Sequence, residues 1–264
     1  MTRPEQPTPE YVPGHDLLAG KVVVVTAAAG AGIGAAVARR ALEEGAEALV
    51  ISDTHERRLG EAQETLSAEF GDRVHSLVVD VTDETQVQAL LDAADEHGGV
   101  DVMINNAGLG GTADVLEMTD DEWSRVLDIT LTGTFRCVRA AGNRMKAAGT
   151  KGVIVNNASV IGWRAQEGQA HYAAAKAGVM ALTRCAALDV APHGIRVNAV
   201  APSLAMHPFL AKVTSDELLA ELKQREAFGR AAEPWEVANV MVFLASDYSS
   251  YMTGEVVSVS SQHD

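Results

Sequence analysis

The stretch that decides the fold is residues 22–58, VVVVTAAAGAGIGAAVARRALEEGAEALVISDTHERR. An apolar run leads into three glycines spaced two apart, Gly30, Gly32 and Gly34, and an alanine-rich helical pattern follows. A second apolar run ends at Asp53, 21 positions after Gly32. A strand, a glycine-rich turn, a helix and a second strand that ends on an acidic residue are typical of a βαβ unit that binds a dinucleotide.

The chemistry of such a turn explains each residue type. The N–H groups at the helix start and the positive end of the helix dipole would face a pyrophosphate, and glycine lets the backbone approach because it has no Cβ. Asp53 would accept hydrogen bonds from the adenosine ribose, and its charge would repel a 2′-phosphate, so the predicted cofactor is NAD. The alternatives are a flexible hinge for the glycines and an N-cap role for Asp53.

Composition bounds the class of protein. The 264 residues are 47% hydrophobic, which is typical of a globular chain that buries a large core. A net charge of −15 argues against nucleic acid and membrane partners and leaves a small-molecule substrate. Cys137 and Cys185 form no disulfide framework, which predicts a reducing cytoplasm. No membrane span, signal peptide or metal site is predicted.

Short Val/Ile-rich runs alternate with amphipathic segments along the chain. Strands are predicted at 21–26, 47–52, 74–80, 100–105, 152–158, 195–200 and 255–259, with helices near 33–44, 56–70, 84–97, 120–148, 172–191 and 234–245. The continuous apolar runs indicate strands buried on both faces, and therefore a single doubly wound parallel α/β (Rossmann) sheet of about seven strands. Residues 1–19 are predicted to be a mobile Pro-rich tail before a domain at 20–264, with a substrate lid around 203–233.

Several further motifs follow the glycine loop. They are DV at Asp80-Val81, NNAG ending at Gly108, NNASV with Ser159, YAAAK with Tyr172 and Lys176, and RVNAVAPS with Pro202. With this combination the chain resembles a classical short-chain dehydrogenase/reductase from about residue 20 to its C-terminus. Over the whole chain it is similar to bacterial steroid-degradation dehydrogenases that act on coenzyme A thioesters.

The resemblance implies an oxidoreductase that transfers a hydride between NAD(H) and a secondary alcohol or ketone, with Ser159, Tyr172 and Lys176 as catalytic residues. Tyr172 and Lys176 share a helix face, and the ammonium is expected to lower the pKa of the phenol, so that Tyr172 exchanges the substrate proton while Ser159 holds the reacting oxygen. The implied cofactor contacts are Gly30, Gly32, Ile33, Gly34, Asp53, Asp80, Val81, Asn106, Ala107, Gly108, Tyr172, Lys176, Pro202 and Ala205.

The substrate side is predicted from the residues between Ser159 and Tyr172, where the family builds a pocket wall, and from the lid. The candidates are Trp163, Arg164, Gln166 and, on the lid, His207. Arg164 suits a carboxylate or phosphate, and a surface pair with Glu167 is the alternative. Segments 120–148 and 172–191 match those that pair between subunits in the family, which implies a homotetramer or homodimer.

Two departures from the family pattern bear on function. The glycine loop is one residue longer than usual, with Ala27 in place of its first glycine, and Thr130 occupies the position of a catalytic asparagine that is implied to hold a water near the lysine. A threonine hydroxyl donates or accepts on a shorter arm, so a shifted water is expected. The second hypothesis is a catalytically silent dinucleotide-binding sensor or scaffold; the intact Ser159, Tyr172 and Lys176 favour an enzyme.

Overall fold

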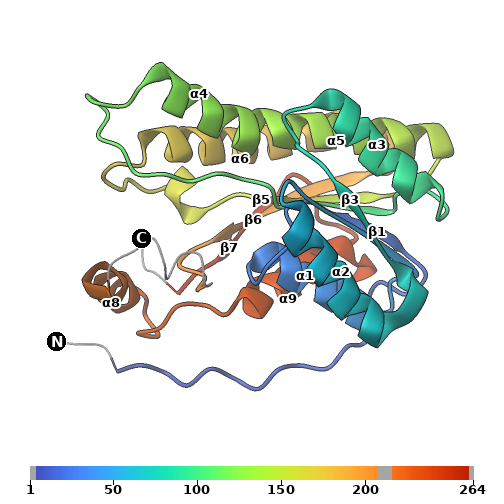
Figure 1. The fold of residues 1–264 in the computed structure, drawn as a ribbon, viewed down its shortest axis with the longest axis horizontal. Coiled ribbons are helices and arrows are strands. Elements are labelled where there is room, and N and C mark those ends of the chain that lie inside the picture. Colours follow the sequence, from blue (N-terminus) through green and yellow to red (C-terminus); the bar gives the residue numbers. More distant parts are fainter. Residues whose placement is uncertain (1–3, 207–215, 262–264) are drawn as a thin grey trace.

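Seven parallel strands form one sheet in the order β3-β2-β1-β4-β5-β6-β7 (Figure 1). The computed structural model describes residues 4–206 and 216–261. The strands are β1 (Val22–Val25), β2 (Ala48–Asp53), β3 (Val74–Val78), β4 (Val102–Asn105), β5 (Val153–Asn157), β6 (Arg196–Pro202) and β7 (Val256–Val259). Each of the seven predicted strands is present, and the predicted doubly wound α/β fold is confirmed.

Helices cover both faces of the sheet, as Figure 1 shows. They are α1 (Ile33–Glu43), α2 (Glu56–Phe70), α3 (Glu84–Asp95), α4 (Asp120–Leu127), α5 (Gly133–Ala148), α6 (Ala170–Val190), α8 (Asp216–Arg225) and α9 (Pro234–Ala245). None of the described helices is long and apolar enough to cross a bilayer.

The alternating side chains of β1 supply both halves of the core. Val23 and Val25 pack with residues of α1 and α9, including Val37 and Met241. Val22 and Val24 point to the opposite face, into a second cluster that includes α3 and α5. Because both faces are buried, the strand reads as an uninterrupted apolar run, which is why the sequence indicated a parallel sheet.

One predicted helix is divided. The segment predicted as a single helix at 120–148 consists of α4, a π-helical turn at Asp128–Thr132 and α5. The turn ends at Gly133, where the helix passes close to the segment that follows β3. A Cβ on Gly133 would lie 2.6 Å from the Val81 side chain. A π-turn adds one residue without ending the helix, and such turns are frequent at functional sites.

The N-terminal segment lies along the domain surface beneath α1 and α9 (Figure 1). A buried ion pair on α1 holds it, because Arg40 contacts Glu44 at 2.7 Å and also donates to the Pro13 carbonyl at 3.2 Å. The Glu44 carboxylate, fully shielded from solvent, accepts from the backbone N–H groups of His15 at 2.7 Å and Leu17 at 3.1 Å. Residues 4–16 form neither helix nor strand, and these hydrogen bonds join part of the segment to the domain.

Candidate active site

The candidate site lies at the carboxyl ends of the parallel strands, where β1 and β4 are neighbours and the strand order reverses. Open α/β sheets bind their ligands at such a switch point. The loop from β1 to α1, the ends of β4 and β5, and the start of α6 all reach this edge. Residues that are far apart in the sequence thus meet at one edge of the sheet.

The glycine loop has the geometry of a phosphate-binding turn. Helix α1 begins after Gly32, its first turn contains no acidic residue, and no side chain caps its N–H groups. Gly30 has a φ of 100°, and space is open where a Cβ would stand at Gly30 or Gly32. At Gly34, in contrast, a Cβ would lie 2.3 Å from the Ala27 carbonyl oxygen. Open space in front of unsatisfied helix N–H groups fits an anionic ligand.

Ala27 occupies the position of the first glycine in the family's loop. Its φ is 52°, in the left-handed region that favours glycine. The conformation required at this position is therefore retained although the residue has changed. The replacement of the loop's first glycine by Ala27 therefore strains the backbone locally but leaves the turn in place.

Asp53 stands at the end of β2 beside the glycine loop. One carboxylate oxygen accepts the Ala29 N–H at 3.3 Å and the other accepts the His55 N–H at 3.0 Å. The alternative N-cap role is wrong, because His55 caps α2 through its Nδ1. Asp53 instead joins β2 to the loop and retains lone pairs for a ligand hydroxyl.

The end of β4 is tied to the same loop by Thr26 and Asn106. The Thr26 hydroxyl accepts the backbone N–H groups of Asn106 and Ala107, both at 3.0 Å. The Asn106 amide donates to the carbonyls of Ala27 at 2.9 Å and Thr26 at 3.2 Å. Sequence reasoning assigned no role to Thr26, and its position directly after an apolar strand is the signal that could have found it.

The remaining predicted cofactor residues also reach this edge. Asp80 and Val81 follow β3, where the Asp80 carboxylate accepts both the N–H and the hydroxyl of Thr82, at 2.9 and 2.8 Å. Pro202 is buried at the end of β6, and the buried Ala205 forms an isolated bridge with Ala232.

Ser159, Tyr172 and Lys176 are brought together at the centre of the site. Ser159 follows β5 and begins a 3-10 turn, where its hydroxyl accepts the Ile161 N–H at 3.3 Å. Its side chain also lies close enough to Tyr172 to act on the pKa of the phenol. The Lys176 Nζ lies 5.6 Å from the centroid of the Tyr172 ring and donates to the Asn157 carbonyl at 2.6 Å.

Burial dominates the ionisation of this pair. It raises the pKa of the Tyr172 phenol, against which the hydrogen bond from Ser159 acts in the lowering direction. Burial also lowers the pKa of Lys176 to about 8. The expected lowering of the phenol pKa by the Lys176 ammonium is therefore not found, because burial is the largest cause acting on Tyr172 and it raises the pKa.

Thr130 contacts the backbone of the loop that follows β4. It is fully buried in the π-turn, and its hydroxyl accepts the Leu109 N–H at 3.0 Å and donates to the Leu109 carbonyl at 3.2 Å. The hydroxyl proton is thus committed to the backbone. Thr130 holds the segment at Gly108, where a Cβ would lie 3.4 Å from the Lys176 Nζ.

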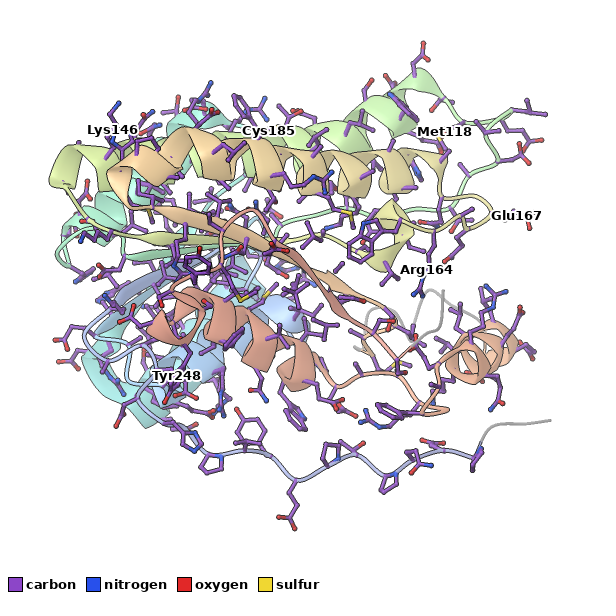
Figure 2. All side chains as sticks on the ribbon, turned by 180° about the vertical axis from the view of Figure 1, so that it is seen from behind. Met118, Lys146, Arg164, Glu167, Cys185 and Tyr248 are labelled. Atoms are coloured by element: carbon purple, nitrogen blue, oxygen red, sulfur yellow. The ribbon has the colours of Figure 1, made fainter. Side chains whose placement is uncertain are left out.

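The predicted substrate residues at 163–166 follow the 3-10 turn after Ser159 and are partly or largely exposed. Trp163 is 50% exposed, Gln166 is exposed and Arg164 is half-buried. Figure 2 shows Arg164 on the side of its turn that faces α8. His207 lies outside the described residues. The described part of the predicted lid contains α8, which the sequence analysis did not predict as a helix.

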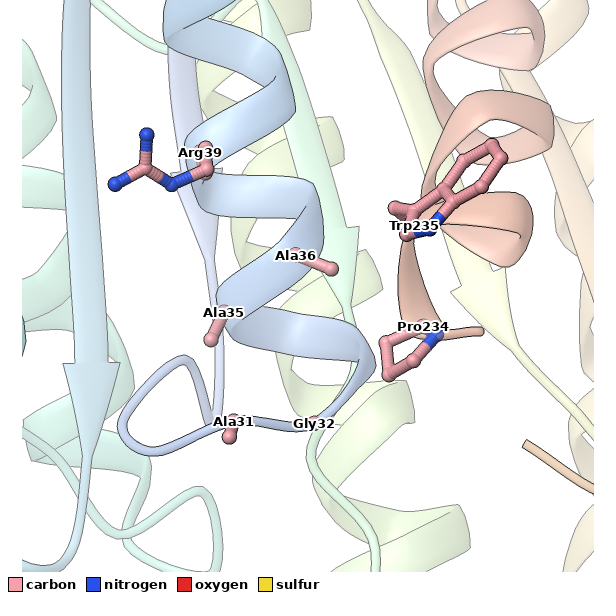
Figure 3. Close-up of a pocket in the computed structure, with 7 residues that line it drawn as sticks. All are labelled: Ala31, Gly32, Ala35, Ala36, Arg39, Pro234 and Trp235. Atoms are coloured by element: carbon pink, nitrogen blue, oxygen red, sulfur yellow. The ribbon is translucent and has the colours of Figure 1, made fainter. Parts of the chain in front are cut away.

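A groove of about 280 Å³ borders the glycine loop, between α1 and α9 (Figure 3). It is lined by Ala31 and Gly32 of the loop, by Ala35 and Ala36 of α1, and by Pro234 and Trp235. Arg39 also borders it but points away from Trp235, and its guanidinium contacts Glu69 at 2.7 Å.

Comparison with known proteins places this site in a family. A family profile described as Enoyl-(Acyl carrier protein) reductase matches residues 27–261. A crystal structure of a short chain dehydrogenase from Mycobacterium smegmatis is 56% identical, covers 98% of this chain and 99% of its own, and has a TM-score of 0.87. The chain belongs to the short-chain dehydrogenase/reductase family. The predicted resemblance is confirmed, and with it an oxidoreductase acting on a small molecule.

Two curated relatives of this short-chain dehydrogenase have known names. One, from Mycobacterium tuberculosis, is "(5R,7aS)-5-hydroxy-7a-methyl-1-oxo-2,3,5,6,7,7a-hexahydro-1H-indene-carboxyl-CoA reductase", 63% identical over 97% of both chains. The other is cis-4-hydroxycyclohexanecarboxylate dehydrogenase from Sinomonas cyclohexanicum, 44% identical over 92% of this chain and 96% of its own. Both names describe a hydroxyl on a carbon ring that carries a carboxyl group.

Proposed function

We propose that this short-chain dehydrogenase transfers a hydride between NAD(H) and a ring-borne secondary alcohol or ketone, with Ser159, Tyr172 and Lys176 as its catalytic residues. The observation that carries the proposal is their meeting at the sheet edge, beside a glycine loop with free helix N–H groups. A silent sensor would have no need of a buried lysine whose ionisation is disfavoured by its site.

The residues divide the reaction between them. When the nicotinamide cofactor is bound, it supplies or accepts the hydride and adds a positive charge in its oxidised form. In the oxidation direction Tyr172 takes the proton of the substrate hydroxyl while the hydride leaves the carbon that bears this hydroxyl. In the reduction direction Tyr172 returns a proton to the carbonyl oxygen. Ser159 donates to that oxygen, and Lys176 favours the charged form of the phenol.

The cofactor fits the described cleft. The loop N–H groups at Gly32 to Gly34 would hold the pyrophosphate, Asp53 the adenosine ribose, and Lys176 the second ribose. We favour NAD(H) because the Asp53 carboxylate repels a 2′-phosphate. Asp53→Ala should weaken NADH binding and strengthen NADPH binding, measured by nucleotide fluorescence without substrate.

The matched control for that experiment is Asp80→Ala, whose carboxylate stands at the neighbouring strand end and is occupied by Thr82. Asp80→Ala should leave the ratio of the two affinities unchanged. Tighter binding of NADPH than of NADH by the wild-type chain would reject the assignment to NAD(H).

For the substrate, we propose a hydroxyl or ketone on a steroid-derived ring whose carboxyl group is a coenzyme A thioester. The support is the 63% identical relative that is named for such a compound. Trp163, Arg164 and Gln166 are the proposed contacts, with the Arg164 guanidinium as the proposed partner of an anionic group. His207 completes the proposed set outside the described residues.

The test is a panel of cyclic secondary alcohols, each as the free acid and as the thioester, assayed with NAD. Faster turnover of the thioesters supports the proposal. Equal rates for the acids and the thioesters would show that the enzyme does not recognise the coenzyme A group of the proposed substrate. Silence across the panel, with NADH still bound, would favour the sensor or scaffold.

We also propose a homotetramer or homodimer in the cytoplasm. A groove of about 370 Å³ between α5 and α6 has an apolar lining that includes Phe135, Val138 and Leu182. Phe135 is 40% exposed, which leaves apolar surface for a second subunit. Cys137 and Cys185 are both free thiols, as a reducing compartment requires. Sedimentation of the wild type against Phe135→Glu tests the interface.

A further inference from the structure

Asn157 is a polar residue of the site to which neither the motifs nor the mechanism assign a task. It is the last residue of β5, two positions before Ser159, and it pairs with Val200 in the neighbouring strand. It stands at the sheet edge that holds the candidate cleft, and it is half-buried. Its side chain therefore borders the cleft while part of it is covered.

Its hydrogen bonds join the two ends of the proposed cofactor site. The Asn157 amide nitrogen donates to the Asn106 side-chain oxygen at 2.9 Å, and Asn106 in turn donates to the Ala27 carbonyl at 2.9 Å. On the other side, the Asn157 backbone carbonyl accepts the Lys176 ammonium at 2.6 Å. A continuous path thus runs from the glycine loop to the catalytic lysine.

The carboxamide oxygen of Asn157 takes no part in these hydrogen bonds. It is shielded from solvent and has no hydrogen-bond partner among the described residues. A buried acceptor without a donor is rare in folded proteins and costs free energy until a donor arrives. Since the amide nitrogen is held by Asn106, the oxygen is left for a group that the chain itself does not supply.

We propose that the Asn157 carboxamide oxygen accepts a hydrogen bond from a ribose hydroxyl or amide N–H of the bound nicotinamide dinucleotide, as a further cofactor-binding residue. The inference rests on the proposed function of the cleft. Hydroxyl and amide donors are the groups a dinucleotide offers beside a lysine that holds its ribose. The path through Asn106 then connects both ends of the cofactor.

The test is NADH binding without substrate, followed by nucleotide fluorescence, in Asn157→Leu. Leucine has a similar size and no acceptor. Its matched control is Asn239→Leu on α9, because the Asn239 oxygen is also shielded and without a described partner but lies outside the cleft. Asn157→Leu should bind NADH about tenfold more weakly, which corresponds to about 1.4 kcal/mol. Asn239→Leu should bind it as the wild type does.

Unfolding of the ligand-free variants separates binding from folding. Asn157→Leu should unfold at nearly the wild-type temperature, and Asn157→Ser, which retracts the polar group, should show the same loss of NADH affinity. An unchanged dissociation constant in both variants would overturn this inference and leave the proposed function standing. A wild-type chain that does not bind NADH would overturn both.

Discussion

The hydroxyl of Thr130 offers a sharp test of how the site is held, through the substitution Thr130→Val. Valine has nearly the same shape as threonine, so the change removes one oxygen from a fully buried position. Two hydrogen bonds are lost, from the Leu109 N–H and to the Leu109 carbonyl. The proposed consequence is a loosened segment at Gly108, next to the Lys176 ammonium.

The magnitude follows from the groups left behind. Each buried backbone group that loses its partner costs about 1–3 kcal/mol. Leu109 is half-buried, so water replaces part of the loss, and we expect the free energy of unfolding to fall by about 2 kcal/mol. Because Lys176 is then less firmly placed, kcat should fall about tenfold, below the usual share of a general base.

Urea unfolding and steady-state rates of the same preparation measure both effects. Thr130→Ser restores the hydroxyl and is the matched control; it should recover most of the stability and rate. Thr130→Asn, which brings the family's usual residue, should remain active. A Thr130→Val chain with wild-type stability and kcat would refute the assignment of this hydroxyl to the Leu109 backbone.

Three further predictions test other parts of the account. Ala27→Gly should raise the free energy of unfolding by about 0.5–1 kcal/mol, measured by urea denaturation, because a left-handed φ of 52° disfavours alanine. Glu44→Ala should lower it by about 3–5 kcal/mol in the same assay, since it leaves Arg40 buried without its partner. Burial lowers the pKa of Lys176 from its ordinary value of 10.5 to about 8. Between these two pH values Lys176 is protonated in the unfolded chain and largely neutral in the folded chain, so the stability of the wild type rises with pH in this range. Lys176→Met should therefore be the more stable chain at pH 7, and calorimetry should show that advantage shrinking as pH rises through this window.

The fold was predictable because its signals are local and repeated. The run of four valines in β1 is buried on both faces, and its apolar continuity indicated a parallel strand directly. The break at Asp128–Thr132 left no comparable signal, since the pattern of 120–148 remains helical while Gly133, directly after the break, packs against the distant side chain of Val81. Close approach between remote segments is invisible in one sequence.

The residues of the site could be predicted from the sequence, but their pKa shifts and hydrogen-bond partners could not. The spacing of Ser159, Tyr172 and Lys176 indicated that they meet, which the structure confirms for the described cleft. The expected lowering of the phenol pKa failed because the degree of burial is a tertiary property. Asn157 went unnoticed for a similar reason: an unpartnered oxygen can be recognised only after every neighbour is in place.

The central claim is that Tyr172 exchanges the substrate proton during hydride transfer to NAD. It is tested most directly by following the near-ultraviolet absorbance of NADH with a ring-hydroxyl thioester, in the wild type and in Tyr172→Phe. The account predicts NADH formation by the wild type, a loss of about a hundredfold or more in Tyr172→Phe, and NADH binding that is retained by the variant. Substantial turnover by Tyr172→Phe would contradict the mechanism.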